Sequence, residues 1–365
     1  MGTKKSLICQ IGPGKDMPGG MLSVIEGYLE SPYLKEFEQM HIVTASSTNK
    51  GKCFFRGIAR YIGLIIKREV KLAHLHMSEK GSCHRAIVLI FVSRLFRIPV
   101  ILHSHGSELE AWYASIKRMQ RKIFCLAMER CAAVVALTPG WKKYWENIVE
   151  DNKIYVIPNC VPSRKHLDRE YLDSGKLNIA FLGYVGERKG TFELLRAVKI
   201  LKDRKIDFCL RIGGNGEIDR CKTLIEQLKL QDDVIIYGWA TGEKKEEILN
   251  LSDVLVLPSM YESFGIVLLE AMAHQLPVIC GSNGYSKELI SEGIDGYIAE
   301  SGNAESIAER MALFNDRDIL KSFGEAAYKK AMKEYSTEHV MYKLKELYQK
   351  LIVEEWKESI YQGGK

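Results

Sequence analysis

The chain has 365 residues, of which 46% are hydrophobic and 27% charged, and its formal net charge at pH 7 is +6. This length predicts two domains, and the composition is that of a folded globular protein rather than a disordered one. The apolar runs of the sequence are too short for a membrane-spanning helix, which needs ~20 consecutive apolar residues. The nine cysteines form no Cys-x-x-Cys pair and no Cys/His cluster at the spacing of metal ligands. This cysteine usage argues against a disulfide framework and a structural zinc site, and it is typical of a cytoplasmic protein.

The charge is divided unevenly along the chain. Residues 1–170 hold 26 Lys and Arg against 15 Asp and Glu, whereas residues 171–365 hold 26 against 31. In the first part, basic residues recur beside aromatic and aliphatic ones in the segments 54–68 and 112–124. Such segments can lie on an anionic membrane surface, although a solvated basic helix face has the same composition. A nucleic-acid partner is not expected, because no recognised nucleic-acid-binding motif is present.

Short apolar runs alternate with longer helix-compatible stretches along the whole chain, which is typical of parallel α/β sheets. The predicted strands cover residues 6–11, 40–45, 73–76, 100–103, 133–137, 154–157, 178–182, 208–212, 234–237, 254–257, 277–280 and 296–299. Each group of six can form one doubly wound sheet. Prolines near residue 160 and a polar stretch after them place the domain boundary there, so we expect domains at 1–163 and 164–339, followed by a helix at about 340–365.

In the first domain, two loops that follow predicted strands carry candidate binding residues. Gly19 and Gly20 precede a helical pattern, but their spacing from earlier glycines is not the dinucleotide-binding fingerprint. His105 follows the strand at 100–103 and precedes Gly-Ser-Glu. His74 and His76 alternate as strand residues do. They could also be metal ligands, but the sequence places no third imidazole or carboxylate at a helpful spacing.

In the second domain, glycine-containing loops follow three predicted strands. Arg188 and Lys189 precede Gly190 at the start of a helical pattern, Gly214 lies in a Gly-Gly-Asn-Gly turn, and Trp239 follows Tyr-Gly. By themselves, such features are also compatible with a solvated basic turn and with turns that need glycine for their backbone conformation.

The stretch 258–277 carries two carboxylates, Glu262 and Glu270, on either side of an expected helix start. Ser263 is a plausible N-cap for this helix, which would place Glu270 about two turns along it. A strand that leads through a Ser-x-Gly turn into a helix presents unpaired backbone N–H groups and the positive end of the helix dipole, which together suit a phosphate group.

This stretch, P-S-x-x-E-S-F-G-x-x-x-L-E-A-M-A followed by L-P-V-I, resembles the Glu, seven residues, Glu signature of retaining GT-B glycosyltransferases of family 4 (group 1). The resemblance implies an α/β GT-B fold, with two Rossmann-like doubly wound parallel-sheet domains facing each other across a cleft. It also implies that the last helix crosses back onto the first domain. By the same resemblance, Glu262 contacts the transferred sugar and Glu270 the ribose hydroxyls.

The other motifs match the same family. Lys189 corresponds to the lysine that neutralises the donor diphosphate, and His105 to the cleft histidine; with Glu262 they are the residues expected to carry catalysis. The remaining residues expected to bind the donor are Gly19, Gly20, Arg188, Gly214, Trp239 (at the base), Ser263, Phe264, Gly265 and Glu270. Two positions depart from the family pattern: Tyr184 replaces an arginine of the diphosphate site, and Gln275 replaces a glycine before Leu-Pro-Val.

The resemblance implies transfer of a hexosyl group, with retention of configuration, from a nucleotide-sugar such as a UDP-sugar to a sugar hydroxyl. We expect no metal and no cofactor, since the Asp-x-Asp string at 316–318 reads as a charged helix start. A lipid-linked glycan at the inner face of the cell membrane is the expected acceptor. The alternatives are a nucleotide-sugar-binding protein without transfer activity and a GT-B enzyme of another kind, a sugar-nucleotide epimerase or a phosphorylase.

Overall fold

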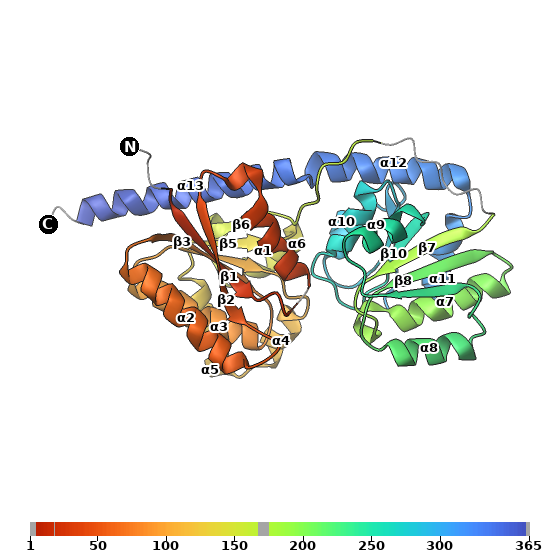
Figure 1. The fold of residues 1–365 in the computed structure, drawn as a ribbon, viewed down its shortest axis with the longest axis horizontal. Helices are drawn as coiled ribbons and strands as arrows, with labels where there is room; N and C mark the ends of the chain where they lie inside the picture. Colours follow the sequence, from red (N-terminus) through yellow and green to blue (C-terminus); the bar gives the residue numbers. More distant parts are fainter. Residues whose placement is uncertain (1–4, 18, 167–174, 363–365) are drawn as a thin grey trace. The chain divides into compact units, whose positions relative to one another are not determined.

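The computed structural model describes residues 5–17, 19–166 and 175–362, and in it the chain divides into two α/β units (Figure 1). The first unit is built from the chain up to Asn159 and from Glu338 onward, and the second from Cys160–Thr337. The division therefore falls a few residues before the boundary that we expected after residue 163. The helix that begins at Thr337 belongs to the first unit from Glu338 onward.

The first unit contains a six-stranded parallel sheet with the strand order β2-β1-β3-β4-β5-β6. Its strands are β1 (Leu7–Pro13), β2 (Glu38–Ala45), β3 (Val70–Met77), β4 (Val100–Ser104), β5 (Ala133–Ala136) and β6 (Ile154–Val156). Its helices are α1 (Gly20–Glu30), α2 (Lys50–Ile66), α3 (Gly81–Leu95), α4 (Leu109–Ser115), α5 (Arg118–Met128), α6 (Pro139–Trp145) and α13 (Thr337–Gln362), with short 3₁₀ helices η1 (Pro32–Leu34) and η2 (Asp151–Lys153). The strand order reverses between β1 and β3, where open parallel sheets bind their ligands.

The second unit repeats this architecture with the strand order β12-β11-β10-β7-β8-β9. Its strands are β7 (Leu177–Leu182), β8 (Phe208–Gly213), β9 (Val234–Gly238), β10 (Val254–Leu257), β11 (Val278–Gly281) and β12 (Gly296–Ala299). Its helices are α7 (Thr191–Asp203), α8 (Ile218–Gln227), α9 (Glu243–Asn250), α10 (Ile266–Ala273), α11 (Ala304–Leu313) and α12 (Arg317–Glu334), with 3₁₀ helices η3 (Glu187–Lys189) and η4 (Ser286–Leu289). Here the order reverses between β7 and β10.

Both sheets are covered by helices on their two faces (Figure 1). This arrangement explains why the strands could be predicted from apolar runs in the sequence. Strands of a sheet buried on both faces become continuous apolar runs, and every residue of β4, β5, β7 and β10 is buried. All twelve predicted strands are confirmed, with differences only at their ends. Among the described helices, none combines the length and the apolar character needed to cross a bilayer.

Helix α13 is fixed to the first unit by Tyr348, which is fully buried. The ring of Tyr348 meets Phe37 edge to face, with 5.4 Å between centroids. Its hydroxyl lies 2.9 Å from Gln10 Nε2 on β1 and 2.7 Å from His74 Nδ1 on β3. The C-terminal helix is therefore bonded directly to the centre of the first sheet.

Candidate active site

In the second unit, Lys189 and Glu262 meet at the point where the strand order reverses. Lys189 closes the loop after β7 and Glu262 lies in the loop after β10, and their side chains form an ion pair that is largely buried. The hydroxyl of Ser259 also approaches Glu262 Oε2, at 3.5 Å. The sequence predicted both residues for this site, and the structure brings them together.

The charges around Glu262 keep it ionised. Burial by itself would raise the pKa of this carboxyl group, but the charges of Lys189 and Arg188, together with a bond from the backbone N–H of Ser263, hold the pKa below its ordinary value. Glu262 is therefore a carboxylate at neutral pH. It can accept hydrogen bonds from hydroxyl groups, and it has no proton to donate.

The backbone around Lys189 is fixed by a glycine. Gly190 has φ +71°, and a Cβ atom at this position would lie 2.1 Å from the carbonyl oxygen of Pro258. The backbone N–H of Met260 donates to the carbonyl of Arg188 at 2.8 Å. Only glycine permits this close approach, so the loops after β7 and β10 are held together at the Lys189–Glu262 pair.

A second glycine, which the sequence analysis did not single out, positions Glu262 itself. Gly284 follows β11 with φ +77°, and a Cβ there would lie 2.4 Å from the carbonyl oxygen of Glu262. The next residue, Tyr285, donates its backbone N–H to the same oxygen at 3.0 Å. The sequence did contain a sign of this residue's role, a glycine in the turn after the strand predicted at 277–280. The carboxyl ends of neighbouring parallel strands meet at one edge of the sheet, so this turn could be expected to lie near Glu262.

The start of α10 differs from the prediction. The N-cap is Gly265, with φ +81° and no side-chain capping bond, so the prediction that Ser263 caps this helix is wrong. The left-handed conformation of Gly265 is incompatible with a helical residue, and the helix begins only at Ile266. Glu270 is consequently one turn, not two, from the start of the helix. Phe264 has a buried side chain that packs near Tyr335, with 6.3 Å between ring centroids, so only its backbone can serve a ligand.

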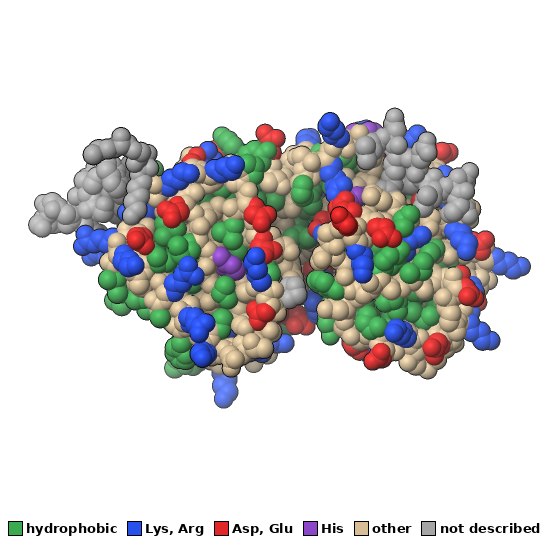
Figure 2. All heavy atoms as spheres, viewed as in Figure 1, with side chains coloured by type: hydrophobic (Ala, Val, Ile, Leu, Met, Phe, Trp, Pro, Cys, Tyr) green, Lys and Arg blue, Asp and Glu red, His purple; other side chains and the backbone are tan. Residues whose placement is uncertain are grey.

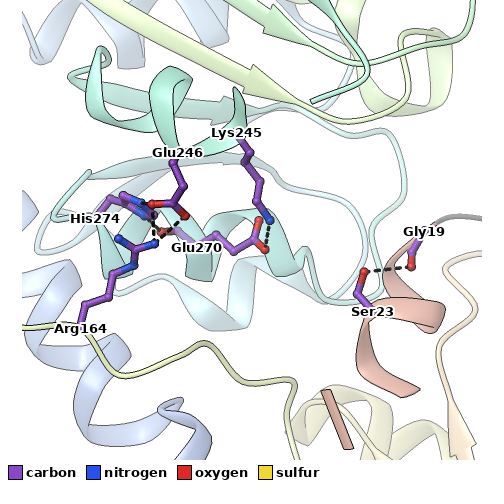
Figure 3. Close-up of polar contacts among 7 residues, drawn as sticks. All are labelled: Gly19, Ser23, Arg164, Lys245, Glu246, Glu270 and His274. Atoms are coloured by element: carbon purple, nitrogen blue, oxygen red, sulfur yellow. Dashed lines mark hydrogen bonds and ion pairs between the residues drawn. The ribbon is translucent and has the colours of Figure 1, made fainter. Parts of the chain in front are cut away.

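Glu270 belongs to a polar cluster between α9 and α10 (Figure 3). Lys245 Nζ lies 2.6 Å from Glu270 Oε1, and the two side chains point toward each other. The neighbouring Glu246 accepts from Arg164 at 2.6 Å and lies 3.0 Å from His274 Nε2. Burial would raise the pKa of Glu246, but its bonds to His274 and Arg164 lower it. The sequence did not predict Lys245 and Glu246 on α9 as part of this cluster, because the sequence of a highly charged helix does not show which of its faces packs against another helix.

The glycine loops predicted for donor binding are packed against each other. A Cβ on Gly214 would lie 1.8 Å from the carbonyl oxygen of Gly183, and the backbone N–H of Gly214 donates to Gly238 at 2.7 Å. Trp239, directly after β9, is 42% exposed, and Tyr184 is 51% exposed. The loops after β7, β8 and β9 thus form one continuous edge, with two exposed aromatic side chains on it.

In the first unit, Gly19 and Gly20 line a cavity of about 230 Å³ at the reversal between β1 and β3. Gly19 caps α1, and its carbonyl accepts from the hydroxyl of Ser23 at 3.3 Å (Figure 3). No described atom lies within 4 Å of the position that a Cβ would take on either glycine. His76 and Arg85 line the same cavity, so this glycine loop borders open space next to polar side chains.

Four histidines stack beside this cavity. Parallel pairing aligns His74 and His76 on β3 with the end of β4, where His76 lies opposite His103. The rings of His103 and His105 are 4.2 Å apart, and those of His74 and His76 are 4.6 Å apart. Burial and the neighbouring imidazoles hold the pKa of His74, His76 and His103 well below the ordinary value, and burial lowers the pKa of His105 to about 3. All four are neutral at physiological pH.

A hydrogen-bonded chain fixes the tautomer of His105. The amide nitrogen of Gln39 donates to the backbone carbonyl of Tyr28 at 2.8 Å, so its oxygen accepts from the amide nitrogen of Gln10, also at 2.8 Å. The oxygen of Gln10 then accepts from His76 Nε2 at 3.0 Å, which leaves His76 Nδ1 to accept from His105 Nε2, at 3.0 Å. His105 therefore carries its proton on Nε2 and presents Nδ1 as an acceptor. We call these residues the Gln39–His105 chain.

The third imidazole that the sequence did not place near His74 and His76 is His103. These three side chains lie close enough together for one metal ion, because adjacent parallel strands align them in a way that spacing along the chain does not reveal. Their rings, however, are nearly parallel, with 16° between His74 and His76 and 18° between His74 and His103. Imidazole binds a metal in its own plane, so stacked rings do not converge on one point. The arrangement favours a hydrogen-bonded cluster over a metal centre.

The Asp-x-Asp string is accounted for by capping. The carboxylate of Asp316 accepts from the backbone N–H groups of Asp318 and Ile319 at 2.9 and 3.2 Å, and α12 follows directly. The interpretation of this string as a charged helix start is confirmed.

Two family models match this chain, one for each unit. The model of "Glycosyltransferase Family 4" matches residues 25–165, and that of "Glycosyl transferases group 1" matches residues 163–330. Among curated proteins, the chain is 24% identical over 308 residues to the UDP-Gal:alpha-D-GlcNAc-diphosphoundecaprenol alpha-1,3-galactosyltransferase of Escherichia coli, covering 80% of this chain and 78% of that protein. It is 26% identical over 323 residues to an uncharacterized 41.2 kDa protein in the cps region of Klebsiella pneumoniae, covering 80% and 86%.

Solved structures share the fold. The structure of Anabaena Alr3699/HepE in complex with UDP superposes with a TM-score of 0.74 at 15% identity, covering 94% of this chain and 99% of that one. Together, the two family models span both units, and each unit has the parallel sheet and carboxyl-edge loops described above. The chain belongs to the group 1, family 4 glycosyltransferases with the GT-B fold.

Proposed function

We propose that this protein transfers a hexosyl group from a UDP-sugar to a sugar hydroxyl of a lipid-linked glycan, with retention of configuration and without a metal ion or other cofactor. The observation that carries the proposal is the buried Lys189–Glu262 pair at the strand reversal of the second unit. The named E. coli relative uses UDP-Gal and a diphosphoundecaprenol-linked sugar, and the Anabaena neighbour binds UDP. The first name supports this donor and acceptor class for the present chain, and the second supports the nucleotide of the donor.

In the proposed reaction, the bond between the sugar C1 and the UDP diphosphate breaks, and C1 bonds to the acceptor oxygen. The proton of the acceptor hydroxyl leaves with the diphosphate. Lys189 turns from Glu262 toward the diphosphate, where negative charge develops, and the start of α10 adds the positive end of its dipole. Arg188, exposed on the same loop, supplies the second positive charge that Tyr184 cannot.

The carboxylates have different tasks in this proposal. Glu262, held ionised, accepts hydrogen bonds from hydroxyls of the transferred sugar, and Glu270 binds the ribose from the free side of its carboxylate. Trp239 stands where the nucleotide base would be seated. In the first unit, His105 presents its Nδ1 as an acceptor for a sugar hydroxyl, and the backbone of Gly19 and Gly20 borders the cavity.

The experiment is an activity screen. UDP- and GDP-sugars are offered with and without a lipid-linked glycan acceptor, and release of the nucleoside diphosphate is measured. We expect acceptor-dependent release that falls by at least about a hundredfold in Lys189→Ala and in Glu262→Ala. Lys199→Ala, which removes a partly exposed lysine paired with Asp203 on α7, is the matched control and should keep wild-type turnover.

Other outcomes would replace the proposal. Conversion of the sugar nucleotide without any acceptor would identify an epimerase, and a requirement for inorganic phosphate a phosphorylase. Binding of the sugar nucleotide without turnover over a broad acceptor panel would identify a protein that only binds it. Wild-type turnover in Lys189→Ala or Glu262→Ala would overturn the residue roles.

A contact with the inner face of the cell membrane is part of the proposal. Helix α2 exposes Phe55 at 71% and Ile66 at 67%, and α3, which packs against α2, exposes Leu95 at 78%. Apolar and basic side chains are interspersed over the region of the first unit where α2 and α5 lie (Figures 1 and 2). We expect Phe55→Ser with Leu95→Ser to reduce sedimentation with anionic vesicles, whereas Leu313→Ser in the second unit, also exposed, should not. Equal sedimentation of all variants would count against the contact.

A further inference from the structure

The first unit has a second cavity, of about 480 Å³, that is lined by none of the candidate active-site residues. It opens between the carboxyl ends of β1 and β2 and the part of α2 up to Arg60. Its volume is within the range of roughly 300–1,000 Å³ that ligand sites occupy. Its lining residues are Gly14, Lys15, Asp16, Val43, Ser46, Thr48, Asn49, Lys52, Cys53, Arg56, Gly57 and Arg60. We call it the basic pocket.

Three cations line one wall of the basic pocket. Lys52, Arg56 and Arg60 follow each other at intervals of four residues on α2, so their side chains share one helix face. Lys15 comes from the opposite wall, the loop after β1. Within the described part of the chain, none of the four forms an ion pair. Like charges collected in a concavity repel each other more strongly than on an open surface, so this lining favours an anionic ligand.

Among the described lining residues, Asp16 is the one with a carboxylate, and this group is hydrogen-bonded within the pocket wall. Asp16 Oδ2 accepts from the hydroxyl of Ser46 at 2.5 Å and from the backbone N–H and hydroxyl of Ser47, both at 2.8 Å. These bonds lower the pKa of Asp16 to about 2. Among the described lining residues, four positive charges therefore face one negative charge, and an oxygen of that carboxylate holds the two loops together.

The walls are built to keep their positions. A Cβ on Gly57 would lie 2.3 Å from the carbonyl oxygen of Val43, so glycine lets α2 approach β2 at this point. The backbone N–H of Gly14 donates to Ala45 at 2.9 Å, which ties the loop after β1 to the end of β2. Helix α2 has 17 residues and begins at the pocket, where its N-cap, Asn49, makes no side-chain capping bond. The helix dipole thus adds to the positive potential.

Lys15 and Arg60 come from different elements, but the charges of both affect the pKa of the same residue, His41. Burial is the main reason why the pKa of His41 on β2 is lowered. The backbone bond to Pro13 and the charge of Glu26 oppose this shift, and the charges of Lys15 and Arg60 add to it. Lys15 lies in the loop after β1 and Arg60 on α2, so a ligand between the two walls can meet cations from both sides.

We propose that the basic pocket binds a diphosphate group, and that in the reaction this is the diphosphate that joins the lipid to the glycan of the acceptor. Arg56 and Arg60 offer planar pairs of N–H donors that match two oxygens of one phosphate group, and Lys15 and Lys52 neutralise the remaining charge. The second part of this inference rests on the proposed function. The first part, a diphosphate site outside the donor site, does not.

The pocket contains its own reporter, Cys53, which is half-buried in the lining. Its rate of alkylation by N-ethylmaleimide is followed by mass spectrometry with and without inorganic pyrophosphate, and Cys209 in the second unit serves as the internal reference. We expect pyrophosphate to slow alkylation of Cys53 at least about fivefold and to leave Cys209 unchanged. The concentration needed should rise on the order of tenfold or more in Lys52→Gln with Arg56→Gln.

The matched control is Lys67→Gln with Arg94→Gln, which removes two charges from the same face of the unit but outside the pocket, and it should behave as the wild type. Absence of protection in the wild type, or equal protection in the pocket variant, would overturn the proposal. A third arm uses vesicles of phosphatidylglycerol. Protection by vesicles without protection by pyrophosphate would assign the pocket to a lipid headgroup and would likewise overturn it.

Activity separates this inference from the proposed function. In the pocket variant we expect the KM for a diphosphate-linked acceptor to rise about tenfold, while slow acceptor-independent hydrolysis of the UDP-sugar stays at the wild-type rate. Unchanged KM with full turnover would sink the acceptor assignment alone. Pyrophosphate protection in a protein that turns over no sugar nucleotide would sink the proposed function and leave the site standing.

Discussion

Gln275 shows how a single backbone position explains a departure from the family pattern. It has φ +60° and follows the last turn of α10, where Leu276 N–H donates to Ala271 and Gln275 N–H to Met272, both at 3.0 Å. This is a Schellman C-cap, whose left-handed residue is usually glycine. The family's glycine is thus required by the backbone, and Gln275 adopts a strained conformation while its side chain reaches His166 at 3.0 Å.

A pair of substitutions at Gln275 separates the strain from the hydrogen bond. Both Gln275→Gly and Gln275→Ala lose the bond to His166, but only glycine relieves the left-handed strain. We expect the free energy of unfolding of the second unit to be about 1 kcal/mol higher for the glycine variant than for the alanine variant, as measured by urea denaturation. An alanine variant of equal or greater stability would refute the strain argument.

The Gln39–His105 chain predicts which ring nitrogen of His105 carries the proton. Because the chain starts at a backbone carbonyl, which cannot change its role, each successive group is fixed, and His105 must be protonated on Nε2. The ¹⁵N chemical shifts of the imidazole should therefore show a protonated Nε2 and an unprotonated Nδ1. In Gln10→Leu, the constraint on His76 is removed and a mixture of tautomers is expected. A protonated Nδ1 in the wild type would show that the assignment is wrong.

At the scale of elements, the loops that follow the strands form the binding edge of each sheet. Two glycines in these loops have opposite surroundings. Gly190 is enclosed by the backbone of Pro258, whereas Gly20 faces open space. We expect Gly190→Ala to cost roughly 2–4 kcal/mol of stability, because it combines left-handed strain with a clash against a rigid carbonyl. Gly20→Ala, at the first position of α1, should leave the melting temperature unchanged within ~2 °C.

The transfer activity of the two glycine variants provides a second test. If the backbone at Gly20 is approached by substrate, the alanine variant should stay folded and lose turnover, while Gly190→Ala should lose both. Circular dichroism and the nucleotide-release assay measure the two properties. A Gly190→Ala variant that melts at the wild-type temperature would contradict the packing argument, and a fully active Gly20→Ala would contradict the role of this glycine loop.

The strands could be predicted from the sequence because burial on both faces of a sheet is enough to produce their apolar pattern. Strands covered on both faces appear as apolar runs, so all twelve could be predicted, and the Glu262 and Lys189 loops followed from their motifs. The start of α10 was mispredicted because Ser263 competes with Gly265, and only the observed φ of +81° decides between a serine cap and a glycine cap. The stacking of His103 on His74 and His76 depends on strand register, and the basic pocket depends on two loops meeting. Neither leaves a periodic signal in one sequence.

At the scale of the whole molecule, the two units differ in how protons affect them. His74, His76, His103 and His105 all lie in the first unit, and their lowered pKa values mean that these imidazoles stay uncharged in the folded unit at pH values where they take up protons in the unfolded chain. Histidine in an unfolded chain titrates near 6.5. The stability that these histidines contribute to the first unit is therefore fully present above about pH 6.5 and is lost as the pH drops toward 3, the folded value for His105.

Calorimetry between pH 7.5 and 5.5 tests this difference, because carboxylates such as Glu262 and Glu246 with lowered pKa values lose their stabilising effect only at lower pH. We expect the transition of the first unit to move to lower temperature by several degrees while that of the second unit changes little. Each buried histidine contributes up to about 1.4 kcal/mol per pH unit once the pH is below 6.5. His103→Asn should reduce the pH dependence by that amount. His84→Asn, at an exposed position on α3, should leave it unchanged, and a second unit that shifts as much as the first would exclude the histidine cluster as the cause.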